Sequence, residues 1–310
     1  MTNLDKYAQL CEKVSLPLHA QAWWMDKTST GKFWDVIILE NAEGEIEAAW
    51  PYHIAKKWGF KAMLIPLHSQ YNYVYISPKA STSIYERLVN ALEETCKSLH
   101  VGMVQIQGFY PAPLLDALRQ RGFNIKERTT YTIEDIPPYT ELPTFFSDNK
   151  RRQLRKAKDL QLVDLSVEEF YRFQESCWAT QGKKIDYPLS WAQAVLTETI
   201  RRQQGRLLAA QTSDGTRLAS LFLTWDNTSA YFLLPSYAPA TKDQGGVAWL
   251  TTQALQIAHD KGLHFDFEGS MTPSIASSYQ QFGGRPTTYH QLEKYYNPLY
   301  RLADWLHQRL

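Results

Sequence analysis

The stretch SAYFLLPSYAPATKDQGGVAWLTTQALQIAHDKGLHFDFEG, residues 229–269, contains the signals of a strand, a glycine turn, a helix and a second strand. SAYFLLPSY is rich in the aromatic and apolar residues that strands prefer. Gly245 and Gly246 then lead into a helix that we expect at 246–261, and the strand HFDFEG follows. This order of elements is typical of a mixed α/β fold.

The elements around this stretch follow an order that the chain uses twice. In the second half we expect strands at 160–166, 206–212, 217–225 and 287–296, helices at 167–180, 190–203 and 273–282, and a terminal helix. In the first half we expect helices at 4–14, 16–25, 83–99 and 113–121, a hairpin about Glu43-Gly44, a β-rich run at 62–78, and strands at 103–109 and 123–136. The halves share no visible sequence identity, so only the element order repeats. We therefore predict two domains, 1–136 and 144–310, with a proline-rich linker at 137–143.

Composition narrows the class of protein. The 310 residues include 33 basic and 32 acidic side chains, a formal net charge of +1, which argues against a wholesale polyanion binder but allows a local basic patch. Cys11, Cys96 and Cys177 form no zinc or disulfide pattern and suit a reducing compartment. The sequence has neither a signal-peptide pattern nor about 18 consecutive apolar residues. We expect a cytoplasmic protein without a metal or a transmembrane segment, and its oligomeric state stays open.

The segment 229–284 resembles the core of the GNAT acyltransferase superfamily. NKRRQLRKA at 149–157 and FDFEGS at 265–270 are similar to segments of its Fem-type branch, the peptidoglycan-bridge aminoacyltransferases. The resemblance implies an α/β (α+β) fold of two tandem GNAT-like domains, each with a mixed, mostly antiparallel sheet flanked by helices. It also implies N-acyltransferase activity, with acyl-CoA or aminoacyl-tRNA as the donor.

The resemblance places the donor at the glycine loop. In the superfamily, backbone N–H groups of such a loop bind a pyrophosphate at a helix N-terminus. One register aligns Lys242, Gly245 and Val247 with the family pattern, and the next aligns Asp243, Gly246 and Ala248. A bulky valine or an acidic residue opposes pyrophosphate binding, so an ordinary glycine-rich turn is the alternative. The expected carrier-binding residues are Leu233, Leu234, Ser236, Lys242, Gln244, Gly245 and Gly246.

The strand HFDFEG supplies the candidate catalytic residues. Alternation on a strand would place Asp266, Glu268 and Ser270 on one face, with Phe265 and Phe267 on the other. A buried carboxylate costs several kcal/mol unless it is paired, so these acids need a reason. We expect Glu268 to be the base that takes a proton from the attacking amine, because N-acyl transfer requires that step. The alternatives for the two acids are an ion pair with Arg or Lys and a cap on the helix that follows. For Ser270 we expect the N-cap of that helix, and hydrogen bonding to the substrate is the alternative.

Three further groups are candidates for substrate binding. Arg151, Arg152 and Arg155, with Lys150, Lys156 and Lys158, predict a cationic helix that binds either a nucleotide-linked acceptor or tRNA phosphates, unless it is a solvated face. Tyr71 and Tyr73 alternate with Tyr75 on a predicted strand and could line an acceptor groove or pack on a sheet. Trp225 and Tyr237 flank the strand SAYFLLPS.

Together these features favour an enzyme that transfers an acyl or aminoacyl group to an amine on a small molecule or a peptide. The sequence contains no GxSxG, GxxxxGK[ST], GxGxxG or HExxH motif, so hydrolase, P-loop, dinucleotide and zincin chemistry are unsupported. A non-catalytic binding module on a degenerate acyltransferase fold is the alternative.

Overall fold

The chain divides into two compact units. The computed structural model describes residues 1–29, 33–157 and 159–307, so Lys158 of the predicted cationic helix lies outside the described residues. Unit 1 consists of Met1–Arg128 and Thr288–Leu310, and unit 2 of Thr129–Thr287. Both divisions fall inside strands, namely β6 (Asn124–Ile133) and β12 (Arg285–Tyr295).

The units differ from the expected domains at residues 129–136 and 288–310. The physical reason for the second difference is strand pairing and packing. The later part of β12 pairs with β5 of unit 1, from His290 opposite Gly108 to Tyr295 opposite Met103. Tyr300 beyond it is fully buried against Ala62 and Met103 of the same unit. A domain boundary inferred from the order of elements along the chain could not predict that β12 and Tyr300 pack with unit 1.

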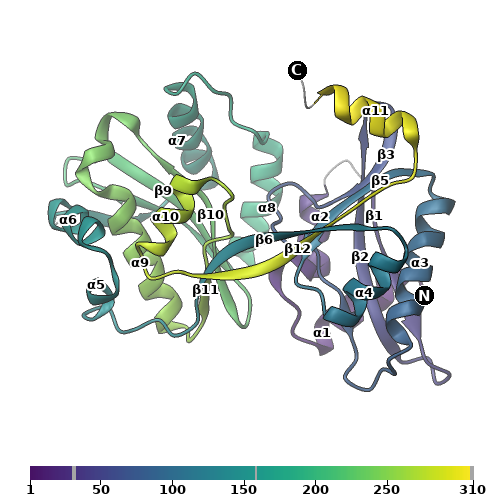
Figure 1. Ribbon diagram of the computed structural model, residues 1–310. Coiled ribbons are helices and arrows are strands. Elements are labelled where there is room, and N and C mark those ends of the chain that lie inside the picture. Colours follow the sequence, from purple (N-terminus) through teal and green to yellow (C-terminus); the bar gives the residue numbers. More distant parts are fainter. Residues whose placement is uncertain (30–32, 158, 308–310) are drawn as a thin grey trace. The chain divides into compact units, whose positions relative to one another are not determined.

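Unit 1 is built on one sheet with helices packed on it (Figure 1). The strands pair in the order β1-β2-β3-β5-β12, with β4 paired to β2; β3 and β5 are parallel and the other pairs antiparallel. The elements are α1 (Asn3–Lys13), α2 (Ala22–Thr28), β1 (Phe33–Glu40), β2 (Ile46–Lys57), β3 (Phe60–Leu64), β4 (Tyr75–Ile76), α3 (Ile84–Ser98), β5 (Val101–Gly108), α4 (Ala112–Gln120) and α11 (Pro298–His307). The main core contains Leu88 and Leu92 of α3 and Leu114 of α4 against Val104 and Ile106 of β5.

Unit 2 repeats this plan with strands of its own. Its strands pair in the order β6-β11-β10-β9-β8-β7, with β10 and β11 parallel and the other pairs antiparallel. The elements are α5 (Leu142–Phe145), α6 (Asp148–Lys156), β7 (Gln161–Asp164), α7 (Val167–Ala179), α8 (Leu189–Arg201), β8 (Gly205–Gln211), β9 (Arg217–Trp225), β10 (Ser229–Tyr237), a 3-10 helix η2 (Pro239–Gln244), α9 (Gly246–Asp260), β11 (His264–Asp266) and α10 (Pro273–Gln280). The expected α/β fold of two units with mostly antiparallel strands is confirmed.

Helices cover both faces of the unit 2 sheet (Figure 1). Leu221 and Leu223 of β9 belong to the same core cluster as Leu250 and Leu255 of α9. Ser220, on the alternate face of β9, accepts a hydrogen bond from Gln174 of α7 at 3.0 Å. Because successive side chains of a strand point to opposite faces, α9 and α7 lie on the two sides of the sheet.

Candidate active site

Strands β10 and β11 part in the middle of unit 2. Their parallel ladder has three pairs and ends where Tyr231 lies opposite Asp266. Beyond it the β11 chain stays with β6, since the Phe267 N–H donates to Tyr131 O at 3.0 Å. β10 bulges instead: its pairing with β9 shifts register between Leu233 and Ser236, and Leu234 has a φ of +50°. A bulge bends its strand. From this point on, the backbone N–H and C=O groups of β10 and β11 therefore do not hydrogen-bond to each other.

Two buried carboxylates occupy the end of β11. Asp266 is 6% exposed and Glu268 is 7% exposed. Asp266 Oδ1 accepts hydrogen bonds from Thr130 Oγ1 at 2.5 Å and from the Glu268 N–H at 2.8 Å. The second bond holds Glu268 in a left-handed conformation with a φ of +59°, which is uncommon for a residue with a side chain and recurs at functional sites. Asp266 therefore positions Glu268.

The expected alternation along this strand is wrong at its end. The strand stops at Asp266, and the left-handed turn at Glu268 continues through Gly269, which has a φ of +68°. Ser270 is half-buried and its hydroxyl accepts from the Thr272 N–H at 3.1 Å. Thr272 is the N-cap residue of α10, so Ser270 forms the turn before that helix and does not cap it.

Aromatic rings pack beside the carboxylates. Tyr279 of α10 stacks on Phe267, with ring centroids 4.6 Å apart, and Phe282 stacks on the same ring at 6.1 Å. Burial, together with the nearby charges of Glu268 and Asp266, raises the pKa of Tyr279 to about 12. Tyr279 is thus a neutral hydroxyl near Glu268 at physiological pH. No signal in the sequence singled out this residue.

The expected carrier loop is a helix N-terminus without a side-chain cap. Gly245 is the N-cap of α9 with a φ of +78°, and Gly246 is the first helical residue. The first N–H groups of a helix have no acceptor inside it. Lys242 and Gln244 are exposed in η2, whereas Val247 packs on the apolar core. The bulk of Val247 is therefore directed into the core, which removes one objection to an anion at this loop.

The two glycines have a structural reason of their own. A Cβ on Gly245 would lie 2.3 Å from Gln153 O of α6, and one on Gly246 would lie 2.6 Å from Leu218 Cβ. Close packing alone accounts for both glycines. The same packing places α6 beside the N-terminus of α9.

The basic side chains of α6 divide into two groups. Arg152, Arg155 and Lys156 are exposed. Arg151 is half-buried and donates to Phe146 O at 2.5 Å and to Asp148 Oδ1, which fixes it to the preceding turn. Arg152 and Arg155 remain candidates for binding an anion, and Arg151 stabilises the start of the helix.

Lys150, which we grouped with the anion-binding side chains of this helix, is buried instead. Its side chain is 6% exposed, and Nζ donates to Ser278 Oγ of α10 at 2.8 Å and lies 4.3 Å from the Phe282 ring centroid. Burial lowers its pKa to about 8. Helical spacing could have indicated this, because Lys150 precedes the inward-facing Leu154 and Ala157 by four and seven residues.

Around the bulge, side chains of α7 already bind β10. Gln174 Nε2 donates to Leu234 O at 2.7 Å. Leu233 and Ser236 are buried, and Ser236 opposes Ser220 in the ladder. Gln174 is a further residue that sequence reasoning missed; its place between Phe170 and Cys177 on the buried face of α7 was the available signal.

Trp225 is the last residue of β9 and lies beside the start of β10, whereas Tyr237 is the last residue of β10. Trp225 opposes Ala230 and Tyr237 opposes Ala219. Residues 230 and 237 are seven positions apart, roughly 23 Å along a strand. Trp225 is a core residue with Lys261 Nζ 4.4 Å from its ring centroid. Tyr237 is half-buried near the bulge, so the structure does not bring the pair together.

The expected row of phenols in unit 1 is wrong, because only Tyr75 and Ile76 of that run form a strand. Tyr71 is buried and packs on Phe109 and Tyr289, with centroids at 5.0 and 5.2 Å. Tyr73 and Tyr75 pack instead on the cluster around Tyr7 of α1. Tyr71 therefore does not share a face with the other two.

At the ends of β3 and β5, the parallel pair of unit 1, another part of the chain lies beside β5. Their parallel ladder ends at Leu64 and Gln105, and the segment around Asn72 then lies beside the continuing β5. The Asn72 N–H donates to Gln107 O at 2.6 Å. Asn72 Nδ2 donates to Pro51 O at 2.7 Å, and its Oδ1 accepts from Trp50 Nε1. Residues near Asn72 thus occupy this position.

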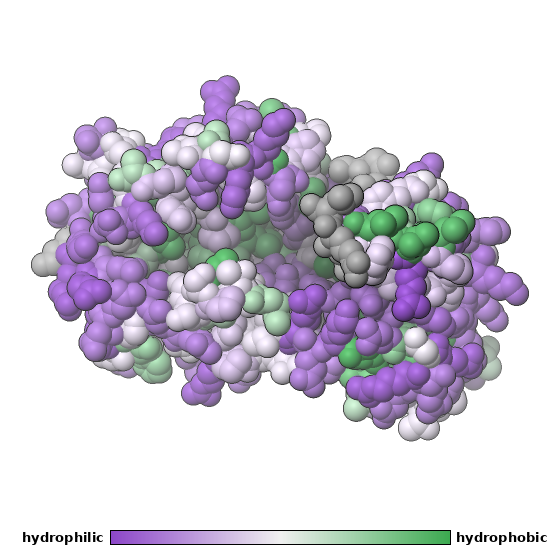
Figure 2. All heavy atoms as spheres, turned by 45° about the horizontal axis from the view of Figure 1, so that its top comes forward, coloured by the Kyte–Doolittle hydropathy of each residue, from purple (hydrophilic) through white to green (hydrophobic). Residues whose placement is uncertain are grey.

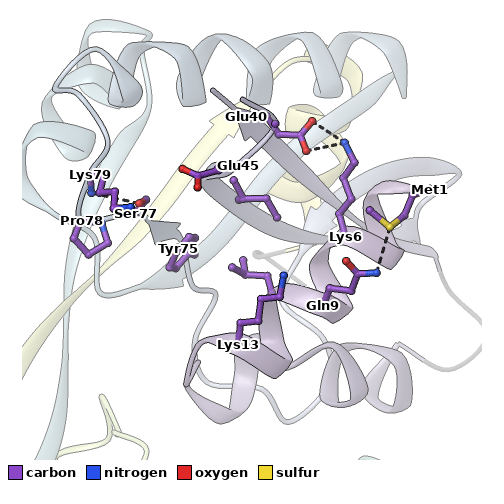
Figure 3. A pocket seen from close by; sticks show the side chains of 13 residues that line it. Met1, Lys6, Gln9, Lys13, Glu40, Glu45, Tyr75, Ser77, Pro78 and Lys79 are labelled. Carbon is purple, nitrogen blue, oxygen red and sulfur yellow. Dashed lines mark hydrogen bonds and ion pairs between the residues drawn. The ribbon is translucent and has the colours of Figure 1, made fainter. Parts of the chain in front are cut away.

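A pocket of about 540 Å³ lies elsewhere in unit 1, between α1 and the β1–β2 turn (Figure 3). Lys6 Nζ bonds both carboxylate oxygens of Glu40, at 2.8 and 2.6 Å. Lys13 and Lys79 line it with Glu45 and Tyr75. Its charges are mixed, and Tyr75 is the only one of the three predicted phenols among its lining residues.

Comparison with known proteins agrees with this fold. Residues 146–276 match the sequence model of the family described as acetyltransferase (GNAT) domain, so this part of the chain, most of unit 2, is a GNAT domain. The whole chain has the fold of tandem GNAT proteins. The crystal structure of FemX superposes with a TM-score of 0.74 at 13% identity, covering 97% of this chain and 98% of that one.

Two further structures share the fold at lower similarity. A tandem GNAT protein from the clavulanic acid biosynthesis pathway has a TM-score of 0.56 at 11% identity, covering 94% of this chain and 92% of its own. L-PGS from Bacillus licheniformis has a TM-score of 0.56 at 11% identity, covering 94% and 90%. A search of curated protein sequences found no match.

Neither a membrane-spanning helix nor a metal-binding cluster is present among the described residues. Within residues 1–29, 33–157 and 159–307, no helix is long and apolar enough to cross a membrane. The same part of the chain holds no group of three or more His, Cys, Asp or Glu side chains placed to bind a metal ion.

Proposed function

We propose that this chain is an N-acyltransferase that moves an acyl or aminoacyl group from an anionic carrier to an amine, and that unit 2 holds the reacting groups. The observation that carries the proposal is the buried Glu268 carboxylate, held in a left-handed turn by Asp266 where β10 and β11 part. A general base fixed in a buried position is what the attack of an amine requires.

Glu268 is the proposed base. The amine nitrogen attacks the carbonyl carbon of the donor and forms the new C–N bond, and Glu268 takes the proton that the nitrogen loses. The bond between that carbon and the carrier's sulfur or oxygen breaks, and the carrier leaves as a thiol or a hydroxyl with the proton that Glu268 returns to it, which restores the Glu268 carboxylate. The Tyr279 hydroxyl, neutral because its pKa is about 12, is the candidate hydrogen-bond donor to the leaving atom. Asp266 acts by positioning Glu268.

The carrier is proposed to bind at the N-terminus of α9. Uncapped N–H groups there attract an anion, and the exposed Arg152 and Arg155 of the adjacent α6 add positive charge. These features suit the phosphates of either acyl-CoA or aminoacyl-tRNA, so both stay candidate donors.

Unit 1 is proposed to serve the acceptor, a small-molecule or peptide amine. The place that corresponds to the parting strands of unit 2 is filled by the chain around Asn72, which argues against a second carrier site there. The alternative function, a non-catalytic binding module, is favoured by one observation: close packing explains Gly245 and Gly246 without any ligand.

The test is the Glu268→Gln variant under single-turnover conditions. We expect the rate of carrier release in the presence of amine acceptors to fall by about 10²–10⁴-fold, the usual contribution of a general base. Glu175→Gln, an exposed glutamate of α7, is the matched control and should leave the rate unchanged. Equal rates for wild type and Glu268→Gln would exclude the assigned base, and no turnover with either donor would favour the binding module.

A further inference from the structure

Gln174 is a polar residue on the buried stripe of α7. Hydrophilic residues cover much of the face of unit 2 that the space-filling view shows (Figure 2). Gln174 is instead 2% exposed, and it shares its side of the helix with the buried Phe170 and Cys177. An apolar side chain would pack at such a position without the cost of removing an amide from water. The contacts of this amide therefore have to explain why a glutamine is present.

The Gln174 amide contacts two strands of the sheet. Its Nε2 donates to Leu234 O of β10 at 2.7 Å and to Ser220 Oγ of β9 at 3.0 Å. Cys177, three residues further along α7, hydrogen-bonds the side chain of Ser236. Side chains of α7 thus hold β10 at Leu234 and again at Ser236.

Leu234 has a backbone conformation that needs support. Its φ of +50° lies in the left-handed region, which is unfavourable for a residue with a side chain. The next residue is Pro235, and a residue before proline prefers an extended conformation. A conformation that opposes both preferences persists only where the surrounding structure holds it. Gln174 supplies such support, because its side chain binds the Leu234 carbonyl.

The strained residue lies in the bulge that bends β10. Between Leu233 and Ser236, β10 has two residues where β9 has one. The bend falls just beyond the ladder of β10 with β11, which ends at Tyr231. Pro235 cannot restore a regular ladder here, because it has no N–H. The separation of β10 from β11 therefore depends on the bulge that Gln174 holds.

The helix that carries Gln174 is fixed at its start. Ser166 and Glu169 form a capping box, and Arg217 of β9 donates to Glu169 Oε1 at 2.5 Å. Phe170 is fully buried in the next position. A side chain on such an element holds its partner more precisely than one on a loop.

We propose that Gln174 is a positioning residue that holds β10 apart from β11 and so leaves the β10 edge open to the carrier. The inference rests on the proposed function, since only that function supplies a carrier. Backbone groups on a strand edge that no other strand occupies are available to a ligand. Gln174 acts through the backbone of Leu234, so its loss should weaken carrier binding and leave the base Glu268 in place.

The first measurement is amide hydrogen exchange, read by mass spectrometry on peptides that cover residues 229–237. Gln174→Met removes the donor and keeps a side chain of similar length. Ser220→Ala is the matched control, because it removes the other acceptor of the same amide and leaves the bond to Leu234. We expect exchange in this segment to be about three- to tenfold faster in Gln174→Met, the effect of one hydrogen bond, and unchanged in Ser220→Ala.

The second measurement is binding of acetyl-CoA by calorimetry and of aminoacyl-tRNA by filter retention. For the carrier that wild type binds, the Kd should rise about three- to tenfold in Gln174→Met. The rate at saturating carrier should stay within about twofold, because the reacting groups are unchanged. Ser220→Ala should match wild type in both. Circular dichroism and the thermal midpoint verify that each variant is folded.

The outcomes separate this inference from the proposed function. Exchange in residues 229–237 that Gln174→Met leaves unchanged overturns the inference, whichever carrier binds. So does equal weakening of carrier binding by Gln174→Met and Ser220→Ala, and so does a loss confined to the rate at saturating carrier. Faster exchange in Gln174→Met, with neither carrier bound by wild type, contradicts the proposed function and with it the assigned use of the bulge.

Discussion

Lys150 places a positive charge inside unit 2 at a cost in stability. Its pKa is about 8 in the folded chain and 10.5 at its ordinary value, so between these pH values the unfolded chain binds more protons. The free energy of unfolding should therefore rise with pH through this window, and the full penalty applies below pH 8. Lys150→Met should be more stable than wild type at pH 7 by about 1–3 kcal/mol, discounted for the lost Ser278 and Phe282 contacts.

Urea unfolding of wild type and Lys150→Met from pH 7 to 10 measures this difference. It should shrink as the pH rises, because the wild-type lysine then loses its charge. Lys184→Met, at an exposed position, is the control and should show a constant difference. A Lys150→Met variant that is less stable at pH 7, or a difference that does not change with pH, would contradict the assignment of a buried, strained charge.

At this scale the sequence singles out the two acids, whose catalytic role stays a prediction, but not their geometry. Two carboxylates between phenylalanines are unusual enough to single out Asp266 and Glu268. Their geometry depends on a hydrogen bond that Thr130 donates to Asp266. Thr130 is 136 residues away in the chain, so no local sequence pattern contains this contact. The contact of Trp225 with Lys261 also joins two separate elements, so local sequence could not predict it.

The contact between α6 and α9 requires a glycine at position 245. Gly245 combines a φ of +78° with Gln153 O only 2.3 Å from the position of an added Cβ. Gly262, at the other end of α9, has a φ of +65° with nothing within 4 Å, so it isolates the conformational cost. We expect Gly262→Ala to lower the free energy of unfolding by about 1–2 kcal/mol. Gly245→Ala should lower it by about 1–3 kcal/mol more through overpacking.

Urea unfolding of the two alanine variants gives both values in one series. Equal losses would mean that α6 moves away from α9 at no cost. In that case Arg152 and Arg155 would not be held beside the helix N-terminus, and the assignment of the carrier site would lose its support.

Elements were predicted well where the signal is local. The helices α3, α7 and α9 were expected from apolar spacing close to the bounds that the structure shows. The run 62–78 was expected to be continuously β-rich but forms β3, an irregular segment and the two-residue β4. Its course is set by long-range bonds such as that of Asn72 to Gln107, which periodicity does not report.

On the scale of the molecule, the repeated order of elements predicted two similar units, and the structure has them. The return of residues 288–310 to unit 1 could not be predicted, because it rests on the pairing of β12 with β5 across more than 180 residues of chain. The two units also differ in their proposed roles. β10 and β11 part in unit 2, whereas in unit 1 the segment around Asn72 lies beside the end of β5. The proposed carrier site therefore lies in unit 2 alone.

The most direct test of this assignment is equilibrium binding of acetyl-CoA, by calorimetry, and of aminoacyl-tRNA, by filter retention at several salt concentrations. We predict saturable binding of one of them that Arg152→Glu with Arg155→Glu weakens about tenfold or more, as expected when phosphate contacts are lost. Arg172→Glu with Lys183→Glu makes the same change of charge at exposed positions of unit 2 away from α6 and should bind as wild type does. Binding of neither carrier, or equal weakening by both pairs, would contradict a carrier site at the N-terminus of α9.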